Sequence, residues 1–235
     1  MPRIGLTLGV AALAALSGAT APAADLKVRL QMTTSKDDVR ATSKERTQYF
    51  TDRMVITEDD KVRAIVDLDA QTLTLVDKLH RTYSVATFET LRARAGKARE
   101  TAGEMSPGTR LRLGLDSPVT VKRTGRTRQV AGQAAAEYAL DSSHARGRVW
   151  VAEAIELPPA GREWEKVSAS LQGDSLRPGQ QLSMEAMKLE GLQMLTSLKV
   201  KVNKQVLHSR SEVLEVREES PPAEFLTVPQ GYAKQ

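Results

Sequence analysis

The stretch VRAIVDLDAQTLTLVDKLHRTYSV, residues Val62–Val85, decides the fold class of this chain. Together with the preceding Lys61 it contains three short runs rich in apolar and β-branched residues, at 61–67, 73–76 and 82–85. An Asp-Ala-Gln turn and a turn that begins at Asp77 separate these runs. Short runs between turn residues are typical of β-strands, because an amphipathic helix needs a longer segment with a period of 3.6. The stretch therefore predicts three consecutive strands of an antiparallel meander.

The same kind of pattern continues on both sides of this stretch. Residues 26–32 alternate between apolar and polar side chains, which is typical of a strand with one buried face. Residues 48–57 predict a second strand or strand pair, and the polar residues 33–43 predict a turn or strand end before it. Gly125 and Gly132 suit turns or bulges. Further strands are expected at 119–121, 129–132, 136–140, 147–155, 195–207 and 211–218.

Two parts of the chain predict helices instead. Residues 88–102 repeat apolar side chains every three or four positions, with Thr87 as the expected N-cap and Gly103 as the expected end. A second helical region is expected within 163–192. Because an open sheet exposes an apolar face unless something covers it, we expect these helices to pack into the concave side. The predicted fold class is mainly β (α+β), with a strongly curved antiparallel sheet that forms an incomplete β-barrel around the inserted helices.

The first 24 residues have the three parts of a secretory signal peptide. Arg3 supplies a positive charge, an uncharged run follows from Ile4 to Leu16, and small residues lead to Ala24. The apolar run is shorter than the ~20 residues that a membrane-spanning helix needs. We therefore predict a signal peptide at 1–24 with cleavage near Ala24. We also predict a single domain at 25–235, export to the periplasm, and no transmembrane segment in the mature chain.

Composition excludes several kinds of chemistry. The chain contains no cysteine, which excludes thiol nucleophiles, zinc–thiolate sites, disulfides and a lipid anchor on cysteine. The three histidines are far apart in sequence and form no zinc-binding motif, so we expect no metal and no cofactor. Aromatic residues make up 4% of the chain, which is too few for the stacking surfaces of nucleic-acid-binding proteins. Nucleic acid is therefore not an expected partner.

A basic cluster is formed by four residues close together in sequence. The whole chain has a net charge of +5, and charges of both signs are interspersed along it. The cluster is either a solvated face of the sheet or a patch that meets anionic lipid headgroups or an acidic partner. Its members are Lys122, Arg123, Arg126 and Arg128.

One motif raises the question of catalysis. The segment Gly173-Asp174-Ser175-Leu176 has the letters of the signature of a lipase and esterase family. That family needs an Asp-x-x-His string after the serine, whereas both such strings here, at 77–80 and 141–144, precede it. We interpret Ser175 as part of a polar loop between helices. The chain is therefore predicted not to be an enzyme, and an esterase that uses Ser175 is kept as a remote alternative.

Five short motifs follow one another in an order known from other exported proteins. They are Asp52-Arg53-Met54 with Ile65-Val66-Asp67-Leu68, Leu73 to Tyr83, Val130-Ala131-Gly132-Gln133 with Glu137-Tyr138, Val149-Trp150-Val151-Ala152, and Phe225 to Tyr232. With these motifs the chain resembles the domain-of-unknown-function branch of periplasmic proteins with the LolA/LolB-like fold. The motifs span most of the mature chain. Ala135 or Ala136 lies where many members of that group carry a cysteine.

The resemblance implies a half-barrel domain over 25–235, in which a curved sheet wraps around helices. In the outer membrane lipoprotein-sorting carriers that share this fold, the cavity between sheet and helices holds acyl chains. Related sensors bind lipidated or peptide signals there. We therefore expect a non-enzymatic periplasmic protein that binds a lipid, an acyl chain or a lipidated partner. The alternative is an envelope protein-interaction or sensor module with a fully packed interior.

Candidate ligand-binding residues are large or adaptable apolar side chains. The segment 184–195 is the most apolar part of the mature chain, and its methionines suit either an ordinary core or a tolerant cavity lining. Arg53 is the candidate for the arginine that gates acyl chains in the carriers. The expected lining residues are Met32, Met54, Ile56, Leu75, Tyr83, Trp150, Met187 and Leu192.

Overall fold

The structure is a computed structural model that describes residues 24–37, 39–114, 117–172, 178–202 and 205–235. Of the predicted signal peptide, only Ala24 is among them. The segment 173–176, which includes Ser175, also lies outside the described residues.

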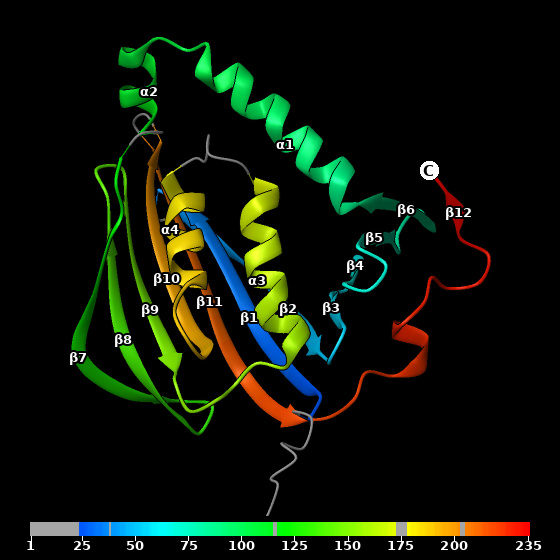
Figure 1. Cartoon of the computed structure of the whole chain (residues 1–235). Helices are drawn as coiled ribbons and strands as arrows, with labels where there is room; N and C mark the ends of the chain where they lie inside the picture. Colours follow the sequence, from blue (N-terminus) through cyan, green and yellow to red (C-terminus); the bar gives the residue numbers. More distant parts are fainter. Residues whose placement is uncertain (1–23, 38, 115–116, 173–177, 203–204) are drawn as a thin grey trace, which may run out of the picture.

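The described residues form one open sheet of twelve strands, in the order β12-β6-β5-β4-β3-β2-β1-β11-β10-β9-β8-β7. All neighbouring strands are antiparallel except β12 and β6, which are parallel. The predicted meander and the open, curved antiparallel sheet are therefore confirmed (Figure 1). The strands are β1 (Leu26–Lys36), β2 (Val39–Phe50), β3 (Met54–Glu58), β4 (Val62–Asp67), β5 (Thr72–Asp77), β6 (Thr82–Thr87), β7 (Thr120–Val130), β8 (Gln133–Asp141), β9 (Ala145–Ala152), β10 (Leu192–Val202), β11 (Gln205–Glu218) and β12 (Ala233–Lys234).

The helices are inserted at two points of the strand order. Helices α1 (Phe88–Gly103) and α2 (Pro107–Leu113) connect β6 to β7, and helices α3 (Pro159–Gln172) and α4 (Pro178–Met187) connect β9 to β10. Figure 1 shows α3 and α4 on the inner side of the curved sheet, while α1 runs from the end of β6 toward α2 across its opening. The predicted helix at 88–102 and its cap are confirmed, because the Thr90 backbone N–H donates to Thr87 Oγ1 over 3.1 Å.

Gly125 and Gly132, which were expected at turns or bulges, lie at a register shift and in a hairpin turn. The β7–β8 pairing shifts register between Arg123 and Thr127, and Gly125 lies there with a φ of 79°. Ala131 and Gly132 connect β7 to β8 with φ angles of 47° and 77°. Positive φ at both central residues is the requirement of the tight hairpin turn whose twist matches that of its strands.

Several predicted boundaries were wrong: residues 120–121 and 129–130 belong to the single strand β7, and the strand expected at 147–155 is β9, which ends at Ala152. Residues 33–43 were expected as a turn or strand end, but most of them belong to β1 and β2. The two strands continue to pair through polar residues, with Thr33 opposite Ser43, so this part of the sheet lacks the apolar alternation that identifies a strand in the sequence. Helix α4 ends at Met187, and Leu192 already begins β10. The boundary predicted between 207 and 211 is also wrong, because β10 ends at Val202 and residues 205–218 form one strand, β11.

Two apolar clusters lie between the sheet and the helices. In the first, Ala160 and Val167 of α3 pack with Phe88 of α1 against Phe50 and Val55 of the sheet. In the second, the buried residues Leu182 and Ala186 of α4 pack against strands β8, β9 and β10. Gly147 of β9 allows this close packing, since a Cβ there would lie 3.3 Å from Leu182 Cδ2 and 2.5 Å from Leu198 Cδ2.

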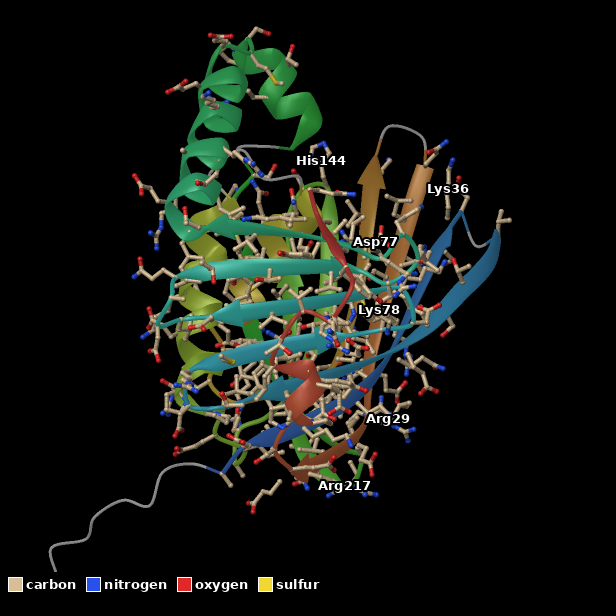
Figure 2. The ribbon with its side chains drawn as sticks, turned by 90° about the vertical axis from the view of Figure 1, so that its right-hand side faces the viewer. Arg29, Lys36, Asp77, Lys78, His144 and Arg217 are labelled. Atoms are coloured by element: carbon tan, nitrogen blue, oxygen red, sulfur yellow. The ribbon has the colours of Figure 1, made fainter. Side chains whose placement is uncertain are left out.

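The C-terminal segment covers the outer face of the first half of the sheet. Figure 2 shows it, in red, lying across the blue and cyan strands of that half. Phe225 packs over the buried outer cluster of Tyr49, Ile56 and Ile65, and its ring centroid lies 5.9 Å from that of Tyr49. The chain end is held at the sheet edge, where the Ala233 backbone N–H donates to the Arg81 carbonyl over 3.0 Å.

Candidate functional site

A cavity of about 650 Å³ lies beside the packed core, between the first half of α3 and the second half of α4. Two connecting segments complete its wall, one joining β9 to α3 and the other joining α4 to β10. Its volume is within the range of small-molecule sites. The lining residues are Glu153, Ile155, Glu156, Leu157, Arg162, Glu165, Lys166, Met184, Met187, Lys188, Leu189, Glu190 and Gly191.

The apolar part of the lining combines two methionines outside the core clusters with residues that belong to or pack against those clusters. Leu182 and Ala186 direct one face of α4 into the sheet, so Met184 and Met187 lie on other parts of the helix surface and reach the cavity. Leu157 supplies a further apolar wall. Thioether side chains adapt their shape, so this wall suits apolar ligands of varied outline.

Gly191 fixes the path of the chain at one side of the cavity. Its φ is 109°, a backbone conformation that other residues rarely adopt. A Cβ at this position would lie 2.6 Å from the Ala152 carbonyl oxygen. The chain can therefore turn closely past the end of β9 and enter β10, which brings Leu189 and Glu190 to the cavity.

Glu165 is a half-buried carboxylate on the α3 wall of the cavity. Burial among these side chains raises the pKa of Glu165 to about 7. The Ser168 hydroxyl does not stabilise the Glu165 carboxylate, since it donates to the Glu165 backbone carbonyl over 3.0 Å. Within the described part of the chain, the Glu165 carboxylate has no hydrogen-bond or ion-pair partner.

The raised pKa of Glu165 predicts how the free energy of unfolding depends on pH. Between its ordinary value and about 7, the folded state binds more protons than the unfolded state, so the free energy of unfolding falls as pH rises. We expect Glu165→Gln to match the parent chain near pH 4 and to be the more stable of the two above pH 7. Thermal unfolding from pH 4 to pH 8 measures this difference. The exposed Glu89→Gln is the control, and its difference should stay within about 0.5 kcal/mol at all pH values.

The charged groups at the rim are mostly arranged in pairs. Glu153 accepts a hydrogen bond from the Tyr138 hydroxyl over 2.6 Å and pairs with Arg123 at 2.8 Å. Arg162 pairs with Glu156 at 3.7 Å. The cavity therefore has paired polar groups beside an apolar wall, which is the usual composition of a ligand site.

The eight predicted lining residues are distributed over several places. Met187 lies on the cavity. Met32, Trp150 and Leu192 belong to or pack against the main core cluster. Ile56 lies in the outer cluster beneath Phe225, and Met54 and Tyr83 lie on that same outer face by strand pairing. Leu75 shares the inner face with Ala64 and is 43% exposed. A role of these residues in ligand binding stays a prediction.

The other residues singled out in the sequence do not line the cavity, although Arg123 of the basic cluster pairs with Glu153 at its rim. Arg53 is exposed in the turn between β2 and β3, where its carbonyl accepts from the Leu68 backbone N–H over 3.0 Å. The basic cluster lies on β7, which is the edge strand of the sheet and is exposed along residues 120–129. Among the described residues, no group of His, Asp and Glu side chains converges as a metal site. None of the helices described has the length and apolar character needed to cross a membrane.

Glu165 and Gly191 line the cavity but were not predicted from the sequence. Glu165 has a detectable signal, because residues 161, 165 and 168 share one face of α3 and the other two are the small, buried Gly161 and Ser168. A carboxylate between two small residues on a buried stripe points to a cavity. The role of Gly191 depends on the close approach of Ala152, which is distant in sequence, and therefore has no local signal.

Several solved structures are similar to this chain at low sequence identity. An uncharacterized conserved protein from Thermus thermophilus is 8% identical, with a TM-score of 0.46 and 90% of each chain covered. PNGF-II is 10% identical with a TM-score of 0.40; 89% of this chain is covered, but it spans only 31% of that protein. A LolA superfamily protein from Nitrosomonas europaea is 8% identical, with a TM-score of 0.31 and coverage of 88% of this chain and 91% of that one.

No curated protein matches the chain at a significant level. The curved antiparallel sheet around inserted helices, which the resemblance implies, is confirmed. Residues 20–232 match a family model. Because this match covers most of the sequence, the chain belongs to the family described as Domain of unknown function (DUF4412).

Proposed function

We propose that this protein is a non-enzymatic binding protein of the periplasm, and that it holds an apolar molecule or acyl chain in the cavity between α3 and α4. The observation that carries this proposal is the cavity of about 650 Å³ with an apolar wall of methionine and leucine side chains. Apolar surface that opens to water beside a packed core is stabilised when a ligand covers it. The leader-like pattern of residues 1–24 supports the periplasmic location.

The size of the apolar wall sets the strength of binding that this site supports. Burial of hydrocarbon contributes ~0.8 kcal/mol per CH₂ group. A chain of eight carbons contributes about 6 kcal/mol before the cost of ordering the ligand is subtracted. The expected affinity is therefore modest, in the range suited to a molecule that is bound and released.

The cavity does not lie between the sheet and the helices, where the LolA-like resemblance implies a binding site. The space between sheet and helices contains the core cluster of Phe50, Phe88 and their neighbours, whereas the cavity lies between the two helices and the segments that connect them to the sheet. A ligand here contacts α3, α4 and the two connecting segments. Release of the ligand therefore does not require the sheet to change its curvature.

Uptake of an uncharged apolar dye tests the proposal. We expect Nile red to bind the purified protein with one site per chain, and native mass spectrometry of gently purified protein to show bound lipid. Met187→Asp places a charge on the apolar wall and is expected to weaken dye binding at least about tenfold. Met105→Asp is the matched control, because Met105 is 36% exposed and lies outside the cavity.

Two results would contradict the proposal. One is the absence of both dye uptake and co-purified lipid. The other is equal weakening by the two substitutions, which would mean that the dye binds elsewhere. Thermal unfolding of each variant shows whether it is folded before its affinity is compared.

A further inference from the structure

The charges that line the cavity do not cancel completely. Its three cationic residues each have an acidic partner in the protein. Arg162 pairs with Glu156 at 3.7 Å. Lys166 pairs with Glu163 at 3.6 Å, and Lys188 pairs with Glu185 at 2.5 Å. A ligand carboxylate would therefore have to compete with a protein carboxylate for every one of these cations.

Two carboxylates of the lining are in the opposite situation. Glu153 and Glu156 have the cationic partners described above, but Glu165 and Glu190 have neither a hydrogen-bond nor an ion-pair partner within the described residues. Glu190 is exposed and its charge is hydrated. Glu165 is half-buried beside the apolar wall, so its charge has lost part of its hydration without gaining a partner.

A partly desolvated carboxylate without a partner favours a cationic ligand. An ammonium group at Glu165 replaces the lost hydration with a charge-assisted hydrogen bond. An anionic group at the same place is repelled by both Glu165 and Glu190. The adjacent wall of Met184 and Met187 requires that the rest of the ligand is apolar.

We infer that the cavity binds a molecule with a protonated amine at one end of an apolar chain, with the ammonium group at Glu165 and the chain against Met184 and Met187. This inference rests on the proposed function and narrows the class of its ligand. Glu165 is its specificity-determining residue.

Competition for the dye site tests the inference at pH 8 and low salt, where Glu165 is ionised. Octylamine, octan-1-ol and octanoate share the same chain and differ in the charge of the head. We expect octylamine to displace Nile red at a concentration about tenfold below that of octan-1-ol, because a hydrogen bond between charged groups is worth about one power of ten. Octanoate should be the weakest competitor. Ethylamine, which lacks the chain, should not displace the dye.

Matched variants locate the effect. In Glu165→Gln the advantage of octylamine over octan-1-ol should fall to about twofold or less, while octan-1-ol binds as before. Glu89→Gln changes the net charge equally but lies on α1, and it should keep the full advantage. Both variants are compared only after thermal unfolding has shown that they are folded.

Two sources offer this chemistry, a free alkyl amine and the ethanolamine headgroup of a lipid. Lysophosphatidylethanolamine is therefore included as a competitor beside lysophosphatidylglycerol, which has no amine. Preference for the former over the latter that depends on Glu165 assigns a lipid source. Preference for octylamine alone assigns a free amine.

The outcomes separate this inference from the proposed function. If octylamine and octan-1-ol compete equally in the parent chain, or if the preference survives in Glu165→Gln, the inference is wrong while apolar binding stands. If neither the dye nor any competitor binds, the proposed function fails and the inference fails with it.

Discussion

Replacement of Phe88 by alanine is expected to lower the free energy of unfolding by about 3–5 kcal/mol. The Phe88 side chain is 2% exposed and belongs to the main core cluster. Its ring centroid lies 6.1 Å from that of Trp164, so it connects the start of α1 to α3. Removal of the ring leaves a cavity that the surrounding strands cannot close, because Phe50 and Val55 are held by the sheet.

Urea unfolding followed by circular dichroism measures this loss, and hydrogen exchange shows where it acts. We expect the amides of α1 to lose protection more than those of β1 and β11, because Phe88 anchors α1. Leu79→Ala is the control, since Leu79 is 64% exposed and its truncation should cost no more than about 0.5 kcal/mol. A loss below about 1 kcal/mol for Phe88→Ala would show that α1 is held by other contacts.

Replacement of Arg63 by alanine is expected to cost about 3 kcal/mol and to release the C-terminal segment. Arg63 is 6% exposed, and its Nε lies 2.6 Å from Glu58 Oε2. Its Nη1 donates to the Glu224 carbonyl over 2.6 Å, and the guanidinium lies 4.4 Å from the Phe225 ring centroid. One side chain therefore ties β4 to the segment that crosses the outer face of the sheet.

The expected cost lies at the low end of the range for a broken buried pair. Lys78, labelled in Figure 2, still pairs with Glu58 at 2.6 Å, so the carboxylate keeps one cationic partner. Limited proteolysis is the second measurement, and cleavage within residues 223–235 should become faster in Arg63→Ala. Arg29→Ala is the control, because Arg29 is about half exposed and its ion pairs are long and hydrated. Equal cleavage rates in the two variants would contradict the role given to Arg63.

Sequence patterns predicted the strands better than they predicted the site. The meander at 62–85 was predictable because hairpin strands are local, with turn chemistry and alternation in one stretch of chain. The polar ladder of residues 33–43 was not, because its strands gain their pairing from each other rather than from an apolar face. Ile56 illustrates the limit for side chains, since its apolar character predicts burial but not the face of the sheet on which it is buried.

The candidate site was the least predictable part, because residues far apart in sequence build it. Met187 was identified from the apolar character of its segment, whereas Glu165 and Glu190 reach the same cavity from different elements. A charge on an amphipathic helix is normally assigned to the solvent side. Its neighbours in space, rather than in sequence, determine that Glu165 is desolvated.

The pairing of β1 with β11 has a consequence for how the chain reaches its native state. These two central strands come from opposite ends of the chain, and the ion pair between Lys27 and Glu219 joins residues 192 positions apart. Contacts that distant make folding slow, since a very large loop must close before they form. A polypeptide that emerges amino-terminus first cannot complete the middle of this sheet until almost all of its length is free. The edge of β1 that pairs with β11 therefore stays unpaired until residues 205–218 have been synthesised.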